Sequence, residues 1–416
     1  MTAASRPAIA PGLPAGGRLG LLRNADFRRL WVVGLVVFAV RWLEMLVVGV
    51  FVYQHTGSAF DVALMTLLRM LPMALFGAVI GAWAERLERR SLLVAVVMSM
   101  LCTSLCLAIL AYAGILAVWH LALASFCNGI AWAADNPVRR VMIGEVVGPE
   151  QMGAAMSVDV GANNASRMLG PTIGGLLLAG MGISGAYTVS VACYGIALCA
   201  ALRVRHRNSI APSPPGAMLA RMIEGLLLAR RDPRLIATLT ITVIFNVFGW
   251  PFTALIPVIG QDNLHLGASG IGVLASMDGV GSFCGAIIMA IYAKPAHYTR
   301  FYLGGVIAYL VTLILFAMAP NAPLAAAALL LTGMSSAAFS VMQATLIYLA
   351  APPEMRSRLY GVLSVCIGFG PLGFLNIGLL ADAVGAAPAA AITGTLGLLA
   401  LAATRRWWRQ LGTAAR

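Results

Sequence analysis

Five ionisable residues lie inside long apolar runs of this sequence. Arg41 and Glu44 are three residues apart in FAVRWLEMLV, so on a helix they lie on nearly the same face. A charge at the centre of a membrane helix costs about 2.5–3.5 kcal/mol, so its presence needs an explanation. An arginine can bind an anionic group, and a desolvated carboxylate can take up a proton. The candidate residues for substrate binding or proton coupling are Arg41, Glu44, Arg69, Arg167 and Asp278.

The composition places these residues in a membrane protein. Hydrophobic residues make up 60% of the 416 residues and charged residues 10%, whereas soluble proteins carry roughly 25% charged residues. Apolar runs of about 20 residues recur along the chain, and each is long enough to cross a bilayer. We therefore expect an all-α membrane protein that crosses the bilayer many times.

The pattern of apolar runs predicts twelve transmembrane helices. We expect them at 30–53, 60–84, 91–113, 116–137, 152–179, 183–203, 235–259, 268–293, 300–319, 322–350, 358–381 and 386–404. A Pro-rich link with basic residues at both ends divides them into two sets of six. The expected organisation is an N-terminal tail (1–29), an N-terminal half (30–203), a central loop (204–234), a C-terminal half (235–404) and a C-terminal tail (405–416).

Positive charges predict the direction of each span. Apart from Arg41, Arg69 and Arg167, all of the 28 Lys and Arg residues fall in the two tails or in the loops on their side. Cytoplasmic loops collect Lys and Arg, so we expect both termini in the cytoplasm and the protein in the inner membrane. The net charge of +13 is then an orientation signal that also faces anionic lipid, and it requires no nucleic-acid partner.

No pattern typical of an enzyme occurs in the sequence. There is no nucleophile–base set, no metal-ligand cluster and no phosphate-binding glycine loop. We expect no catalytic residue, no metal and no cofactor. The seven cysteines all lie in apolar runs and are expected to be free thiols.

The loop after the second span carries a longer motif, GAWAERLERR. It resembles the cytoplasmic signature of the major facilitator superfamily, Gly-x-x-x-Asp-Arg-x-Gly-Arg-Arg. Gly81, Arg86, Arg89 and Arg90 match it, with Glu85 in place of the Asp and a second glutamate in place of the second glycine. In that superfamily the loop latches one half to the other, so the resemblance implies a cytoplasmic gate near the start of the eleventh span.

The fifth span carries SVDVGANNASRMLGPTIGG. It resembles the antiporter motif of the same superfamily, with matches at Gly170, Pro171, Gly174 and Gly175 and serines in place of two earlier glycines. Small residues let helices approach closely, and a proline frees a backbone carbonyl and bends the helix. The resemblance favours export.

Three further stretches resemble the branch that includes the enterobactin exporter and macrolide efflux proteins. They are NPVRRVMIGEVV, RMLGPTIGG and PPEMRSRLYGVL, with matches at Pro137, Arg139, Arg167, Arg356 and Arg358. The arginine that many proton-coupled exporters carry in the fourth span is absent, and Ser125 stands near its place. Proton coupling by that arginine therefore does not carry over.

The superfamily resemblance implies the major facilitator fold, with two pseudo-symmetric six-helix halves around a central site. Helices one, two, five and eight border that site, so the five ionisable residues are expected around one wet cavity. Three positive and two negative charges would suit an anionic or zwitterionic substrate. Glu44 and Asp278 are the candidate proton carriers. A purely structural Arg41–Glu44 pair is the alternative, and Asp135 and Asp159 are expected near the cytoplasmic surface.

The leading functional hypothesis is a secondary transporter. It would export a small amphipathic or anionic molecule, siderophore-like or drug-like, by alternating access driven by inward proton flow. The alternatives are a nutrient uptake permease, and a lipid flippase or non-transporting membrane scaffold. The expected partners are the substrate, protons and the bilayer, and the chain is expected to act as a monomer.

Overall fold

The fold is known from a computed structural model of the chain. It describes residues 21–148, 150–206, 226–227, 230, 232–352 and 355–411, and within these it leaves out the side chains of 22, 77–86, 356–357, 360 and 409–411. All the regular elements in these described ranges are helices. Most of the predicted central loop lies outside the described residues.

The N-terminal half is a bundle of long helices. They are η1 (Leu21–Arg23), α1 (Ala25–Thr56), α2 (Ala59–Arg86), α3 (Arg89–Tyr112), α4 (Val118–Val147) and α5 (Met152–Leu202). Asn24 begins α1 by accepting the amides of Asp26 and Phe27, at 3.0 and 3.2 Å. Gly57 ends it with φ of 65°, a conformation that favours glycine.

The label α5 covers two predicted spans, which together are 51 residues long. Gly182, with φ 66° and ψ −173°, breaks the helical geometry and turns the chain back. The fifth and sixth predicted spans are therefore two helices, 152–181 and 183–202, separated by Gly182.

The C-terminal half contains the remaining helices. They are α7 (Pro233–Ile244), η2 (Phe245–Gly249), η3 (Trp250–Leu255), α8 (Ile256–Asp262), α9 (Ala268–Tyr292), η4 (Pro295–His297), α10 (Tyr298–Ala317), α11 (Ala322–Ala350), α12 (Arg356–Ile367), α13 (Gly370–Val384), α14 (Ala386–Ala403) and α15 (Arg405–Leu411). The short helix α15 occupies most of the predicted C-terminal tail and packs against α7.

Two of the predicted spans in this half are interrupted. The seventh changes from α-helix to a π-helix at η2 and a 3-10 helix at η3, and Pro251 and Pro257 each remove one backbone donor from it. The eleventh breaks between α12 and α13, at Gly368 and Phe369, just before Pro371.

The described helices account for the twelve predicted spans. Ten described segments are long and apolar enough to cross a membrane. The more polar α4 and the second part of α5 complete the set. The all-α major facilitator fold is therefore confirmed.

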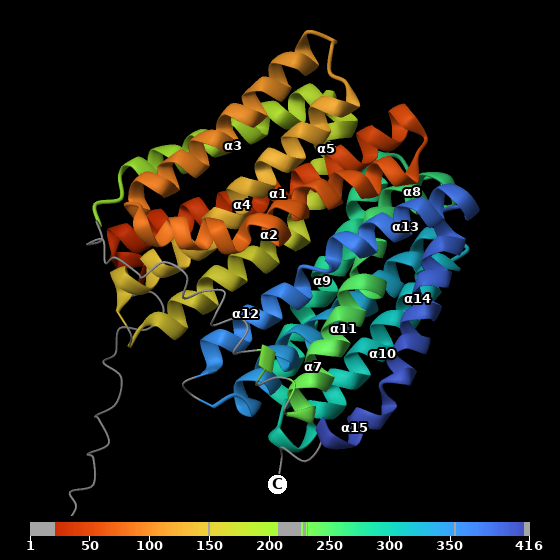
Figure 1. Cartoon of the computed structure of the whole chain (residues 1–416). Helices are drawn as coiled ribbons and strands as arrows, with labels where there is room; N and C mark the ends of the chain where they lie inside the picture. Colours follow the sequence, from red (N-terminus) through yellow and green to blue (C-terminus); the bar gives the residue numbers. More distant parts are fainter. Residues whose placement is uncertain are drawn as a thin grey trace, which may run out of the picture.

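The two halves meet along two helix pairs. The first part of α5 packs against α9, and α2 packs against α13. In Figure 1 the N-terminal half, red to yellow-green, and the C-terminal half, green to blue, are separate bundles. We call the end with the arginine-rich connections, such as α2–α3, the basic end. The other end, with the α1–α2 and α8–α9 turns, is the opposite end.

Candidate functional site: a central cavity and a side chamber

Glu44 is the centre of a polar network inside the N-terminal half. Its side chain is 3% exposed, and Arg69 of α2 donates to it at 3.2 Å. Ser104 of α3 donates to the other carboxylate oxygen at 3.0 Å, and Asn128 of α4 lies 3.5 Å from the first. Arg69 also donates to the backbone carbonyl of Arg41, at 3.3 Å. The network therefore links α1, α2, α3 and α4 through one carboxylate.

A small chamber with an empty volume of about 340 Å³ borders this network. Glu44, Arg69 and Asn128 lie in its wall, together with Ser125 and Tyr187. We call it the side chamber. It gives the Glu44–Arg69 pair a space in which water or a proton donor could reach it.

Arg41 does not pair with Glu44. Its guanidinium lies 3.7 Å from the ring centre of Trp132 and 5.5 Å from that of Trp42, and its Nε is buried without a partner. The cationic face of an arginine is attracted by an aromatic ring, which explains how this charge is accommodated. The alternative of a structural Arg41–Glu44 pair is therefore wrong, because Arg69 from the neighbouring helix pairs with Glu44 instead.

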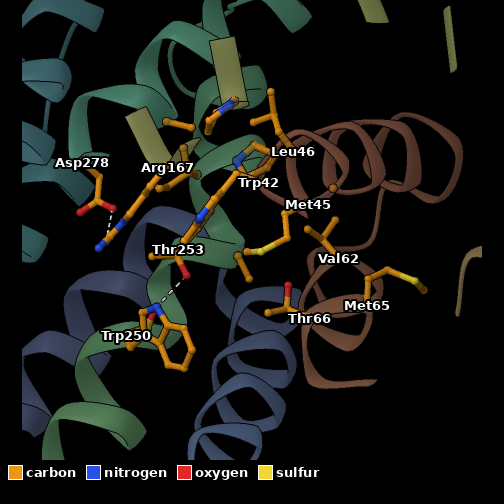
Figure 2. A pocket seen from close by; sticks show the side chains of 16 residues that line it. Trp42, Met45, Leu46, Val62, Met65, Thr66, Arg167, Trp250, Thr253 and Asp278 are labelled. Carbon is orange, nitrogen blue, oxygen red and sulfur yellow. Dashed lines mark hydrogen bonds and ion pairs between the residues drawn. The ribbon is translucent and has the colours of Figure 1, made fainter. Parts of the chain in front are cut away.

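A larger central cavity lies between the two halves. Its empty volume is about 710 Å³, and its lining residues come from α1, α2 and α5 on one side and from η3, α8 and α9 on the other. Large apolar side chains dominate the wall, and Figure 2 shows Trp42, Met45, Met65 and Trp250 around the space. Such a wall suits a ligand with a substantial apolar surface.

Arg167 and Asp278 are the only charged residues among those described in the wall of the central cavity. Nη2 of Arg167, on α5, forms a short ion pair with Asp278 of α9, drawn as a dashed line in Figure 2. Nη1 of Arg167 also lies 3.4 Å from the Ser282 hydroxyl. Nε of Arg167 and Oδ1 of Asp278 are buried without a partner. The pair thus joins the two halves and leaves one donor and one acceptor unused.

The glycines of the antiporter-like motif explain how Arg167 reaches this place. A Cβ on Gly170 or Gly174 would press on the α1 backbone near Leu43, and one on Gly175 would overlap the carbonyl oxygen of Ala268 in α9. Pro171 lies against Gly272 of α9 in the same way. Because these positions lack side chains, α5 is wedged between α1 and α9, one turn from Arg167.

The five predicted site residues therefore do not surround one cavity. Arg167 and Asp278 line the central cavity, Glu44 and Arg69 line the side chamber, and Arg41 lines neither. The first, second, fifth and eighth predicted spans, which are α1, α2, the first part of α5 and α9, do border the central cavity, as expected. Met45, Met65 and Thr66 line both spaces and form the wall between them. The net charge of the central cavity's described lining is zero rather than positive.

The predicted gate is only partly described. Gly81, Glu85 and Arg86 lie in the stretch 77–86, whose side chains are outside the described residues. Arg89 forms an ion pair with Glu145 of α4, and Arg90 donates to the Leu202 carbonyl at 2.8 Å. Both arginines thus contact the N-terminal half itself, and α12 packs against α7 and α11 in the other half.

Sequence reasoning missed the polar contacts that hold the halves together at the opposite end. Asp382 of α13 accepts from the Ser58 hydroxyl and from the Phe60 amide, both at 3.0 Å. Tyr53 of α1 donates to Asp262 at the end of α8. The only signal in the sequence was a lone aspartate in each of two loops without basic residues, GQDNLHLG and ADAVGAAP.

A buried charge cluster near the basic end was also missed. Asp135, Arg139 and Asp159 are all 0% exposed, so the two aspartates that were expected near the cytoplasmic surface are enclosed by the bundle at that end. Arg139 bonds Asp135 at 3.4 Å and forms a short pair with Asp159, and Arg140 lies 3.6 Å from Asp159. The burial of both carboxylates is possible because Arg139, from the same helix face as Asp135, lies between them and compensates their charge.

Metal binding finds no support in the side chains described. No group of three or more His, Cys, Asp or Glu residues among them is placed to hold a metal ion.

A family model described as transmembrane secretion effector matches residues 17–411, nearly the whole chain. The chain belongs to this family. It is a branch of the major facilitator superfamily, so the protein is a multi-pass membrane transporter.

Curated relatives of this family member are efflux proteins. Macrolide efflux protein A of Streptococcus pyogenes is 21% identical over 378 residues, which cover 89% of this chain and 93% of the relative. The multidrug efflux pump Tap of Mycolicibacterium fortuitum is 25% identical over 363 residues, covering 85% and 86%.

Solved transporter structures share the fold of this family member. The nucleoside transporter NupG superposes with a TM-score of 0.75 at 11% identity, over 92% of this chain and 99% of that one. A bacterial homologue of the human lysosomal transporter Spinster, in an inward-facing and unoccupied conformation, superposes with a TM-score of 0.68 at 16% identity, over 94% and 97%.

Proposed function

We propose that this transporter exports a small amphipathic molecule from the cytoplasm by alternating access, driven by inward proton flow. The efflux activities printed for the two curated relatives support the direction. The alternating arrangement of basic loops supports an orientation with the basic end in the cytoplasm.

The observation that carries the proposal is the Arg167–Asp278 pair. It bridges the two halves at the wall of the central cavity, and each partner has one buried polar atom without a hydrogen-bond partner. A substrate that hydrogen-bonds either group weakens the pair and so loosens the contact between halves. Substrate binding is thereby coupled to the relative movement that alternating access requires.

The described contacts at the opposite end support a conformation that is closed on the outside. Tyr53–Asp262 and Ser58–Asp382 both cross between halves at that end. Opening to the outside has to break them, so these contacts define the step that substrate or proton binding must drive.

The cavity wall supports an amphipathic substrate without net negative charge. Its aromatic and methionine side chains offer apolar surface, and its two charges cancel. An anionic substrate is less well supported than the sequence suggested, because Arg41 and Arg69 lie outside the wall. A macrolide is a suitable first test compound, given the printed activity of one relative.

Glu44 is the favoured proton site. It lies in a chamber that shares the wall of Met45, Met65 and Thr66 with the central cavity. A change in the charge of Glu44 therefore changes the electrostatic potential in that cavity. Among the described residues its carboxylate pairs with Arg69 alone, and protonation would release that arginine. Asp278, held directly by Arg167, is favoured as the substrate-responsive carboxylate.

The test is transport into inverted membrane vesicles, in which export appears as accumulation. With an acidic interior, vesicles containing the wild-type protein should accumulate radiolabelled macrolide or an amphipathic dye, and a protonophore should abolish the accumulation. The Arg167→Gln/Asp278→Asn variant, present at equal amount, should accumulate none. Uptake by intact cells together with no accumulation in inverted vesicles would contradict export and favour a permease.

A further inference from the structure

A third pocket lies away from the transport path, at the basic end of the N-terminal half. Its empty volume is about 870 Å³, and it is lined by Arg29 of α1, Arg90 of α3, and the residues at the end of α5, Leu202, Arg203, Val204 and Arg205. Four arginines, one each from α1 and α3 and two from the segment after α5, thus converge on one space. We propose that this pocket binds the phosphate headgroup of an anionic glycerophospholipid from the cytoplasmic leaflet.

The charge balance of the pocket favours a phosphate. Asp26 is the acid next to it, and that carboxylate is engaged by Arg29 at 2.6 Å and by the backbone amides of Arg205 and His206. In the described part of the chain, the guanidinium groups of Arg203 and Arg205 have no carboxylate within ion-pair distance. The lining therefore keeps about three uncompensated positive charges, and arginine forks match phosphate oxygens.

Arg90 is a further charged hydrogen-bond donor in the pocket wall. One of its terminal nitrogens is fixed by the Leu202 carbonyl at 2.8 Å, while its Nε is buried without a partner. The bond to Leu202 holds the guanidinium at the pocket wall, where its positive charge can attract a phosphate.

The surroundings favour a lipid over a free anion. The outer faces of α3 and of the second part of α5 carry exposed apolar side chains, including Met98, Leu105 and Ile196, exposed by 42%, 44% and 59%. These two helices pack together and form one edge of the molecule in Figure 1. Leu202, 49% exposed, continues this apolar surface into the pocket wall. Acyl chains can follow the two helices while the headgroup occupies the arginines.

The proposed orientation places the pocket in the leaflet interface where anionic lipids attract basic residues. A zwitterionic headgroup adds an ammonium, which the net positive lining repels. The pocket should therefore select phosphatidylglycerol over phosphatidylethanolamine.

The test uses the purified full-length protein and three probes, phosphatidylglycerol, phosphatidylethanolamine and inorganic phosphate. Binding is counted by native mass spectrometry, and the affinity for each probe is measured from the shift in thermal unfolding. The variant is Arg203→Gln/Arg205→Gln, because both side chains are exposed and their loss should leave the bundle folded. The matched control is Lys294→Gln/Arg300→Gln, which removes two exposed charges from the same end outside the pocket.

We expect one tightly retained phosphatidylglycerol in the wild type and the control, and at least about tenfold weaker binding in the pocket variant. Phosphatidylethanolamine should bind weakly to all three proteins. If the control variant lost as much phosphatidylglycerol binding as the pocket variant, the general positive charge of this end, and not the pocket, would hold the lipid. That result would overturn the proposal. Equal protection by inorganic phosphate alone, or equal retention of phosphatidylethanolamine, would overturn the lipid assignment. Each of these outcomes is independent of whether the protein exports a substrate.

Discussion

Arg167 of α5 and Asp278 of α9 form an ion pair that joins the two six-helix halves at the wall of the central cavity. The two helices also approach closely beside this pair, since α5 meets α9 at Gly175 and Gly272 without side chains between the two backbones. Because this ion pair lines the cavity and joins the halves, a ligand that changes the pair also changes the contact between the halves.

Neutralising Asp278 should stop transport without unfolding the protein. Asp278→Asn removes the partner of Arg167, which keeps its contact with Ser282 and borders the cavity. We expect macrolide accumulation in inverted vesicles to fall at least about tenfold, which corresponds to a loss of about 1.4 kcal/mol. Ser282→Ala is the control, since it leaves the ion pair in place and should lower macrolide accumulation less than Asp278→Asn does. Accumulation at the wild-type rate in Asp278→Asn would remove this residue from the site.

Neutralising Glu44 should uncouple transport from protons. Glu44→Gln keeps hydrogen-bonding atoms toward Ser104 and Arg69 but has no titratable group. Accumulation driven by a pH gradient should disappear, while downhill efflux of preloaded substrate continues at a substantial rate. Ser104→Ala, which keeps the carboxylate, should still respond to the gradient. A Glu44→Gln/Asp278→Asn double variant that still concentrates substrate would rule out both carboxylates as the proton site.

The partner of Glu44 can be identified by a double-mutant cycle. Removing Glu44 or Arg69 alone leaves a buried charge unpaired and should destabilise the protein by about 3–5 kcal/mol. Glu44→Leu/Arg69→Leu should recover most of that loss, as measured by thermal unfolding in detergent. The same cycle with Arg41 should show a coupling below about 0.5 kcal/mol, because Arg41 lies over Trp132 instead. A larger coupling to Arg41 than to Arg69 would contradict the observed pairing.

Asp382 should keep the opposite end closed. Asp382→Ala removes the acceptor of the Ser58 hydroxyl and the Phe60 amide, two hydrogen bonds to a charged group. In a cysteine-free background, a Thr253→Cys probe in the cavity wall should then react several-fold faster with a reagent supplied from outside. Asp61→Ala, which removes a neighbouring acid that forms none of these hydrogen bonds, should not change the rate. An unchanged rate in Asp382→Ala would mean that other contacts close this end.

Gly175 should tolerate no side chain. A Cβ there would overlap the Ala268 carbonyl oxygen, whereas a Cβ on Gly180 in the same helix would meet nothing within 4 Å. We expect Gly175→Ala to destabilise the protein by about 1–3 kcal/mol and to impair transport. Gly180→Ala should do neither. Equal behaviour of the two variants in thermal unfolding would show that the α5–α9 crossing is looser than described.

The sequence determined the fold class and the place of the small-residue motif in the fifth span. Apolar runs, loop charges and helix caps act locally, so the twelve spans and the positions of Gly170 to Gly175 could be identified without knowing what packs against them. The intramembrane charges could be found in the same way, because each is conspicuous within its own apolar run.

Partners across helices were decided only by the tertiary structure. Spacing placed Arg41 and Glu44 on one face, yet Arg69 from α2 reaches the carboxylate and a tryptophan from α4 holds Arg41. Likewise, Asp135 and Asp159 could be buried because Arg139 enters between them. The division into a central cavity and a side chamber depends on Met45 of α1 and Met65 and Thr66 of α2, which line both spaces. A charge in a membrane is stabilised by whatever group lies beside it in space, and sequence spacing gives that neighbour only within a single helix.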